Sequence, residues 1–159
     1  MKRIEYLKRI YEGRLIEINP KRLLITVPKD EFISALSTFK VNSFNQLTFV
    51  TAVDWIKESE FEIVANLYSR ENRLNVFVKT RISRDNAEIQ TITSIYSVAK
   101  KYEVELTEMF GIKVVGNEDA GKPFLLENWK SKPPLRKEFD SVAYAAEHYE
   151  ARHAEEKND

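Results

Sequence analysis

The sequence contains no cysteine, and this absence removes several kinds of site at once. Disulfides, thiolate-bound zinc and iron–sulfur clusters held by this chain would all need cysteine. The only two histidines, His148 and His153, are five residues apart, whereas a zinc-binding pair on one face of a helix needs a spacing of three or four. We therefore predict that the chain binds no metal and no cofactor of its own.

Glycine and long apolar runs are also scarce. The four glycines form no phosphate-binding loop, so neither a nucleotide nor a dinucleotide fingerprint is present. No stretch approaches the roughly 20 apolar residues of a membrane span, and the charged start MKRIEYLKRIYEG is not typical of a signal peptide. The 25 basic and 25 acidic residues cancel, so no overall field attracts nucleic acid. We expect no catalytic residue, no nucleic-acid partner and no direct membrane span.

What is present indicates one compact α+β domain with appendages. Apolar residues make up 43% of the 159 positions, which is enough for a real core. Period-2 alternation predicts strands, and spacings of three and four predict helices. The expected elements are a helix over 4–11, a hairpin of 14–18 and 23–27, a helix capped by Asp30, an antiparallel meander of 47–55, 61–69 and 74–82, and a long helix from Ile92 to Phe110 with Thr91 as its N-cap. Together they predict an antiparallel or mixed sheet backed by helices.

Two acids interrupt apolar patterns and allow different interpretations. Asp54 ends an apolar strand, and we interpret it as an aspartate that initiates a turn by accepting nearby backbone N–H groups. Glu103 lies on the apolar stripe of the long helix. It either reaches solvent or pairs with a buried base, because a buried and unpaired carboxylate is expensive.

After Gly111 the chain continues without regular periodicity, and we divide it into an α+β domain at 1–112, an extended docking arm at 113–139 and a tail at 140–159. Structureless segments beyond roughly 12 to 15 residues are usually functional or disordered. This one is apolar at Phe124, Leu125, Leu126 and Trp129, so we expect it to be covered only when a partner is bound. The acidic tail is either a solvated helix with a frayed or disordered end, or a second docking element.

Two blocks of sequence carry a resemblance to a known family. They are Glu103-Val104-Glu105-Leu106-Thr107-Glu108-Met109-Phe110-Gly111-Ile112 and Pro134-Leu135-Arg136-Lys137-Glu138-Phe139. In this order and separation they resemble the family of the 30 kDa subunit, or C subunit, of respiratory complex I. The chain departs from the family pattern at Val104, Asn117 and Glu127, where the family has arginine, histidine and proline. These departures are typical of a distant branch that includes the equivalent subunits of membrane-bound, energy-converting nickel–iron hydrogenases and related complexes.

The resemblance implies a cofactor-free scaffold subunit in the hydrophilic arm of an ion-pumping oxidoreductase, on the cytoplasmic side of the cell membrane. It would dock on the large catalytic subunit beside iron–sulfur subunits, and those partners would carry iron–sulfur clusters and, in the hydrogenase branch, a nickel–iron site. The partner-binding and structural residues implied are Glu103, Glu105, Glu108, Phe110, Gly111, Phe124, Leu125, Leu126, Trp129, Pro134, Leu135, Arg136 and Lys137.

Two points stay open at the level of sequence. The alternative function is a free-standing binding module whose basic Lys130–Lys137 patch meets an acidic protein or nucleic acid. Within that patch, the Arg136 guanidinium follows a stiff Pro133-Pro134-Leu135 approach and is suited to a carboxylate, either Glu103 or an acid on the large subunit.

Overall fold

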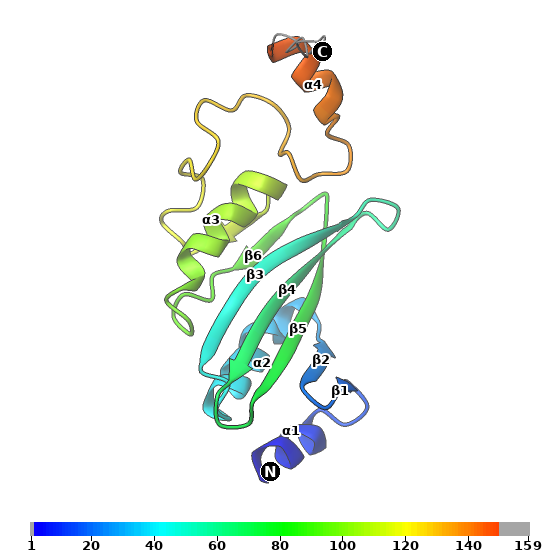
Figure 1. The fold of residues 1–159 in the computed structure, drawn as a ribbon, viewed down its shortest axis with the longest axis vertical. Helices are drawn as coiled ribbons and strands as arrows, with labels where there is room; N and C mark the ends of the chain where they lie inside the picture. Colours follow the sequence, from blue (N-terminus) through cyan, green and yellow to red (C-terminus); the bar gives the residue numbers. More distant parts are fainter. Residues whose placement is uncertain (1, 150–159) are drawn as a thin grey trace, which may run out of the picture.

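The computed structural model describes residues 2–149, which form a five-stranded mixed sheet, a small second sheet and four α-helices (Figure 1). The large sheet has the spatial order β1 (Leu15–Asn19), β2 (Arg22–Thr26), β5 (Leu74–Ser83), β4 (Glu60–Ser69) and β3 (Gln46–Trp55). The second sheet pairs β6 (Glu88–Gln90) with β7 (Lys113–Val115) in parallel. The helices are α1 (Lys2–Ile10), α2 (Phe32–Val41), α3 (Ala99–Phe110) and α4 (Ser141–His148), with a 3-10 turn at Lys29–Glu31 before α2.

The α+β class and the mixed sheet predicted from the sequence are confirmed. Strands β3, β4 and β5 form the expected antiparallel meander, and β1 and β2 form the expected hairpin. The parallel element arises because β2 pairs with β5, with Leu23 opposite Val76 and Ile25 opposite Val78. Between β2 and β5 the chain forms α2, which crosses the sheet, and then strands β3 and β4.

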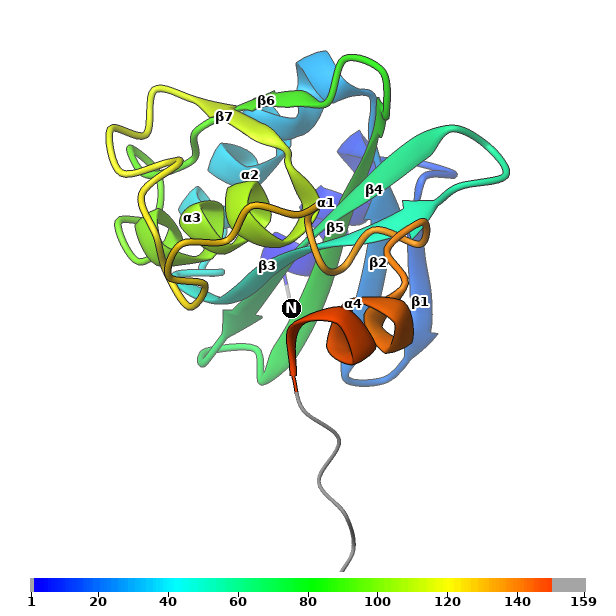
Figure 2. The same ribbon diagram turned by 90° about the horizontal axis from the view of Figure 1, so that it is seen from above.

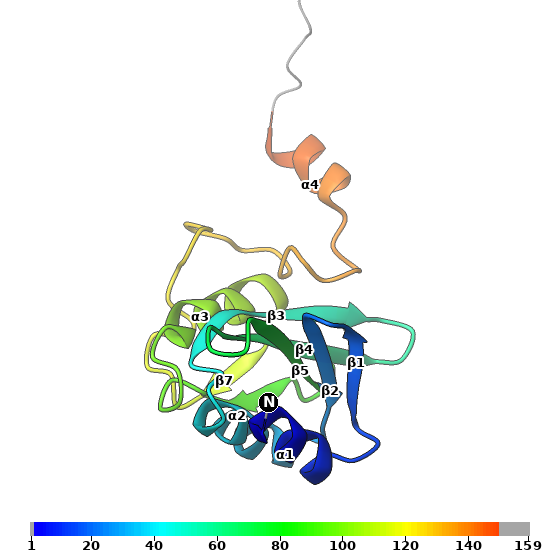
Figure 3. The same cartoon turned by 60° about the horizontal axis from the view of Figure 1, so that its bottom comes forward.

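The inner face of the sheet carries the core, and the helices cover it. Phe61, Ile63 and Leu67 of β4 and Val76 and Val78 of β5 are buried on this face. Helix α2 packs against β5 and α3 packs against β3. In Figure 1 the strands pass in front of α2, and Figure 3 shows α1 and α2 on the same side of the sheet. Among the described residues, no helix packs on the opposite, outer face.

The long helix predicted from Thr91 begins later than expected. Helix α3 starts at Ala99, and residues 92–98 form turns. The Thr91 hydroxyl bonds the Glu103 carboxylate at 2.7 Å instead of capping the helix at position 91, so this N-cap prediction was wrong. The short strands β6 and β7 were not predicted, because three residues are too few to establish a period.

The segment beyond the domain runs without helix or strand from Gly116 to Asp140. The sequence predicted that the arm begins at residue 113, but Lys113–Val115 form β7 within the body of the domain. In Figure 2 the segment crosses α3 before it reaches α4. Helix α4 stands away from the sheet in Figures 1 and 3, and it contains no buried residue. The tail predicted for 140–159 is described only to residue 149, where its first part is helical.

Candidate docking site

The beginning of the C-terminal segment is held by Glu103, which is 2% exposed. Its Oε1 accepts the backbone N–H of Ile92 at 2.7 Å, and its Oε2 accepts Asn117 Nδ2 at 2.8 Å in addition to the Thr91 hydroxyl. The Asn117 amide also donates to the Lys100 carbonyl at 3.0 Å. The buried charge is therefore stabilised by three donors, one of them on the segment itself.

Asp119 adds an ion pair just beyond this point. Its carboxylate lies 2.8 Å from Lys100 Nζ on α3. Hydrogen bonds from the Lys100 and Lys122 ammonium groups lower the pKa of Asp119 to about 2. This pair fixes the direction in which the segment leaves β7.

The middle of the segment is held by Glu108 of α3. The carboxylate accepts three consecutive backbone N–H groups, from Phe124 at 2.8 Å, Leu125 at 2.9 Å and Leu126 at 3.1 Å. Burial raises the pKa of Glu108, but the three backbone donors together outweigh it and the pKa ends below its ordinary value. Glu108 thus positions the apolar residues of the segment by binding their backbone.

The end of the segment is held by an ion network on the sheet. Asp54 Oδ1 lies 2.8 Å from Arg84 Nε, and Asp54 Oδ2 accepts the backbone N–H of Lys137 at 2.9 Å. The Arg84 guanidinium also pairs with Glu138. Because the Asp54 side chain is 1% exposed and that of Arg84 is 15% exposed, water screens this network little.

Arg136 is fixed beside this network rather than free in solvent. Its Nε donates to the Phe110 carbonyl at 2.7 Å, and its guanidinium lies over the Phe61 ring, 5.3 Å from the centroid. The Arg84 guanidinium lies over the same ring, also at 5.3 Å. The backbone N–H of Leu135 donates to the Met109 carbonyl at 2.9 Å, so the block 134–139 is bound to the C-terminal end of α3.

Gly111 is required where α3 ends, because residues 134–139, the closing block, pack against this end of the helix. It adopts the left-handed conformation with φ of 70° and closes the helix. A Cβ at this position would lie 3.0 Å from Pro133 Cγ and 3.2 Å from an Arg136 guanidinium nitrogen. A side chain here would therefore displace the closing block as well as strain the backbone.

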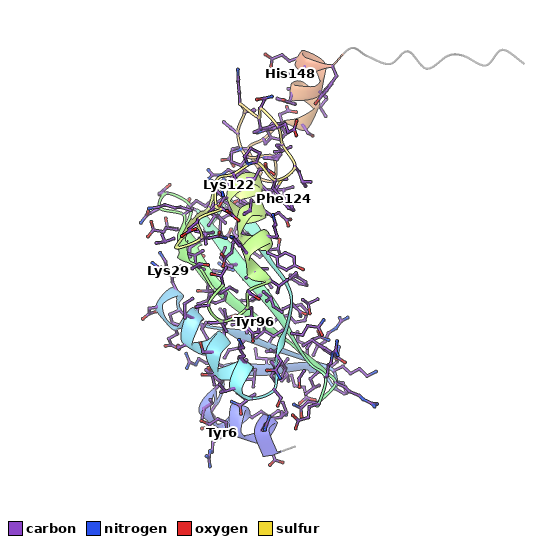
Figure 4. All side chains as sticks on the ribbon, turned by 90° about the vertical axis from the view of Figure 1, so that its left-hand side faces the viewer. Tyr6, Lys29, Tyr96, Lys122, Phe124 and His148 are labelled. Carbon is purple, nitrogen blue, oxygen red and sulfur yellow. The ribbon has the colours of Figure 1, made fainter. Side chains whose placement is uncertain are left out.

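The attachments leave much of the segment's apolar surface in water. Phe124, Leu125 and Leu135 are 39%, 68% and 49% exposed, whereas Leu126 packs against the core. In Figure 4, Phe124 lies where the body ends and His148 lies further out on α4. Val142 on α4 and Tyr149 just beyond it are also exposed. These residues form a broken apolar surface along the segment and α4.

An aromatic cluster joins the segment to α4. Trp129 and Phe139 lie 4.6 Å and 5.5 Å from the ring centroid of Tyr144, and Tyr144 stacks on His148 at 4.0 Å. The Trp129 indole N–H donates to the Lys132 carbonyl at 2.9 Å. Three exposed bases lie in this part of the sequence, namely Lys130, Lys132 and Lys137. No acid among residues 2–149 forms an ion pair with them.

Most of the predicted site residues fall into two groups. The attachment is formed by Glu103, Glu108, Phe110, Gly111 and Arg136, and the side chains on or near the surface are those of Phe124, Leu125, Trp129, Leu135 and Lys137. Glu105 is partly exposed and forms no hydrogen bond within the described part of the chain, and Pro134 is half-buried beside the block.

The structure excludes Glu103 as the carboxylate that binds Arg136, and the interpretation of Asp54 was wrong. Glu103 and Arg136 do not pair, because Glu103 is enclosed by Thr91, Ile92 and Asn117 and Arg136 binds the Phe110 carbonyl. Asp54 accepts no backbone N–H from residues near it in the sequence; it binds the Arg84 guanidinium and the backbone N–H of Lys137. The roles of Arg84 and Asn117 were missed from the sequence, although an acid at the end of an apolar strand was a signal that a base had to lie nearby.

Residues 2–149 contain no cluster of side chains suited to a metal ion, and no helix among them is long and apolar enough to cross a membrane. The fold and site define an α+β domain whose C-terminal segment is fastened to the body and exposes apolar and basic side chains.

Comparison with known proteins identifies the family. Residues 25–145 match the model of the respiratory-chain NADH dehydrogenase, 30 Kd subunit. The chain belongs to this family. The C subunit of the NADH-quinone oxidoreductase of Geobacter metallireducens is 28% identical over 131 residues, 80% of each chain. The C subunit of the F(420)H(2) dehydrogenase of Methanosarcina mazei is 31% identical over 124 residues, 77% of this chain and 78% of the relative.

Solved structures agree with this assignment. A chain of the membrane-bound sulfane sulfur reductase, an archaeal respiratory membrane complex, superimposes with a TM-score of 0.87 at 33% identity, over 100% of this chain and 98% of that one. A fragment of Nqo5 superimposes with a TM-score of 0.63 at 20% identity, over 74% of this chain and 97% of the fragment, which shows the shared fold.

Proposed function

We propose that the chain is a non-catalytic subunit of a complex I-like, membrane-bound, ion-pumping oxidoreductase and docks on its large catalytic subunit. The observation that carries this proposal is the C-terminal segment, which Asp54, Glu103 and Glu108 hold in place while Leu125 and Leu135 stay exposed. Such an arrangement reduces the conformational entropy that binding would otherwise cost. The family membership and the likeness to a chain of an archaeal respiratory membrane complex support it.

The chemistry of the surface favours a protein partner that offers apolar pockets with acids around them. Leu125, Leu135 and the partly exposed Trp129 are suited to be anchors. The basic rim of Lys130, Lys132 and Lys137 adds steering and specificity more than affinity. The redox centres would belong to the partner subunits, as iron–sulfur clusters or a nickel–iron site. The assembly would place this chain on the cytoplasmic side of the membrane without crossing it.

The test is co-purification of the tagged full chain from native membranes. We expect it to bring down a large catalytic subunit together with iron–sulfur subunits. Leu125→Glu should abolish the association, because it puts a charge into an apolar pocket. Val41→Glu is the matched control, since Val41 is 77% exposed at the end of α2, away from the segment. A chain that purifies alone from native membranes would overturn the proposal and favour a free-standing binding module.

A further inference from the structure

A groove with a volume of about 790 Å³ runs past the start of β3. Its walls come from the end of α2, residues 43–47, the end of β4 with the turn after it, and residues 95–98 ahead of α3. In Figure 4 Tyr96, which lines the groove, lies between Tyr6 and His148 and nearer to Tyr6. No residue of the C-terminal segment lines this groove, so it is a surface separate from the candidate docking site.

The groove passes an uncovered part of the sheet edge. Strand β3 is an outer strand of the large sheet, so every second residue directs its backbone N–H and C=O groups away from β4. At Thr48 this edge is occupied by α3, because the Tyr102 hydroxyl donates to the Thr48 carbonyl at 2.7 Å. Just before Thr48, Asn45 and Gln46 are exposed and line the groove. The start of β3 is therefore open to an additional extended segment.

Two bases that line the groove carry charges that no acid among residues 2–149 neutralises. Arg70 is exposed and forms no hydrogen bond or ion pair with the other described residues. The Lys40 ammonium donates to the Ile95 carbonyl and lies 5.3 Å from the ring centroid of Tyr96, so it is held at the wall of the groove. This contact uses one of the three N–H groups of the ammonium, and the other two are left for a further acceptor.

The acid at the groove, Glu71, is already engaged within the chain. Its Oε2 accepts the Ser43 hydroxyl at 2.6 Å and lies 3.4 Å from Arg3 Nη1. The Ser43 hydrogen bond and the Arg3 charge lower the pKa of Glu71, so the carboxylate is ionised at neutral pH and is balanced by Arg3. The charge that remains at the groove is that of Lys40 and Arg70, and it is positive.

We propose that this groove binds an extended, acidic segment of a partner protein, which adds its backbone to the start of β3 and places its carboxylates on Lys40 and Arg70. Acids at every second position fit this arrangement, because successive side chains of a strand point to opposite faces. Apolar side chains between the acids would meet Ile95 and Val98, of which Val98 is 53% exposed. A neutral or basic segment would leave the two bases unpaired, and a small anion would leave the strand edge unused.

The experiment titrates two capped peptides into the isotope-labelled full chain and follows its amide NMR shifts. One peptide alternates glutamate and valine over six residues, and the other has glutamine in place of each glutamate. We expect the acidic peptide to shift the amides of Gln46, Leu47 and Ser97 and to bind about tenfold more tightly than the neutral one, because charge-assisted hydrogen bonds are roughly twice as strong as neutral ones. Added salt should weaken the binding of the acidic peptide alone.

A charge reversal at the groove provides the second measurement. Arg70→Glu should lower the affinity for the acidic peptide by about tenfold, because it puts a like charge where a carboxylate has to bind. Arg73→Glu is the matched control, since Arg73 is exposed in the same turn between β4 and β5 but does not line the groove. This variant should keep the affinity within about twofold.

Several results would overturn the inference. Absence of binding, equal binding of the two peptides, equal losses in the two variants, or shifts confined to residues outside the groove would each exclude an acidic segment at this site. Displacement of the peptide by an equal concentration of inorganic phosphate would make the groove a site for small anions. Self-association that Arg70→Glu abolishes would assign the groove to a second copy of this chain. Because the binding is measured on the chain alone, it stands or fails independently of co-purification with a membrane complex.

Discussion

Asp54 and Lys137 lie 83 residues apart, and the carboxylate of the first accepts the backbone N–H of the second at 2.9 Å. Through this bond the end of β3 fixes where the closing block 134–139 ends. Because the acceptor is buried and the donor is a backbone group, the contact does not depend on which side chain stands at position 137. Lys137 is thereby left with its ammonium group directed to the surface.

Replacing Asp54 with alanine should destabilise the chain by about 3 to 5 kcal/mol, because it leaves Arg84 without its buried partner. Urea denaturation measures the loss, and hydrogen exchange should show the closing block opening first. The matched control is Glu60→Ala, which removes the more exposed Glu60–Arg81 pair and should cost about 0 to 1 kcal/mol. Equal losses would mean that the Asp54 network is no stronger than a surface pair.

Replacing Glu103 with alanine should cost about 2 to 5 kcal/mol, since the Ile92 N–H and the Asn117 amide lose their buried acceptor. Glu105→Ala, two residues away on the same helix, should stay within about 0.5 kcal/mol because its side chain is partly exposed. Chemical denaturation of the two variants decides the matter. A Glu105 variant as unstable as the Glu103 variant would contradict this account.

Acid should release residues 124–126 from α3. The pKa of Glu108 is lower in the folded chain than in the unfolded chain, so its stabilising effect is fully present above the unfolded value of about 4.3 and is lost as the pH falls through the lower, folded value. Amide NMR shifts of Phe124, Leu125 and Leu126 should follow this titration. In Glu108→Gln the titration should disappear; if the three amides still shift together, another group is responsible.

Arg136→Ala should weaken assembly far more than Lys130→Ala. Arg136 binds the Phe110 carbonyl and lies over Phe61, so its loss frees the closing block, whereas Lys130 is exposed. Arg136→Lys should restore only part of the assembly, because an ammonium keeps the charge without the planar group that lies over the ring. The yield of co-purified complex measures the effect. Similar yields for the two alanine variants would make Arg136 a dispensable surface charge.

The regular part of the fold could be predicted because it has a period. Strands at 47–55, 61–69 and 74–82 were found within a residue or two, since each is a run of β-forming residues between polar turns and the third also alternates. The late start of α3 could not be predicted, because residues 92–98 keep helical spacing while Glu103 draws the Ile92 N–H into a turn. A contact between side chain and backbone across 11 residues leaves no periodic signal.

The candidate docking site could likewise be predicted only in part. Its apolar residues, such as Leu125 and Trp129, were visible in the sequence because a long aperiodic segment with many apolar groups is unusual. Its attachments were not, because Asp54 and Glu108 bind backbone N–H groups, and any residue except proline supplies one. Composition therefore indicated what the segment presents, and only the three-dimensional arrangement showed what holds it.

Helices α1 and α4 lie at opposite ends of the molecule, as Figure 1 shows. This arrangement has a practical use for measurement: a fluorescent donor on the exposed surface of α1 and an acceptor on α4 would report the distance between the two helices by energy transfer. A fusion protein joined ahead of α1 would sit at the far end from the docking segment. The chain can therefore be immobilised or labelled at that end while its C-terminal helix stays free to engage a partner.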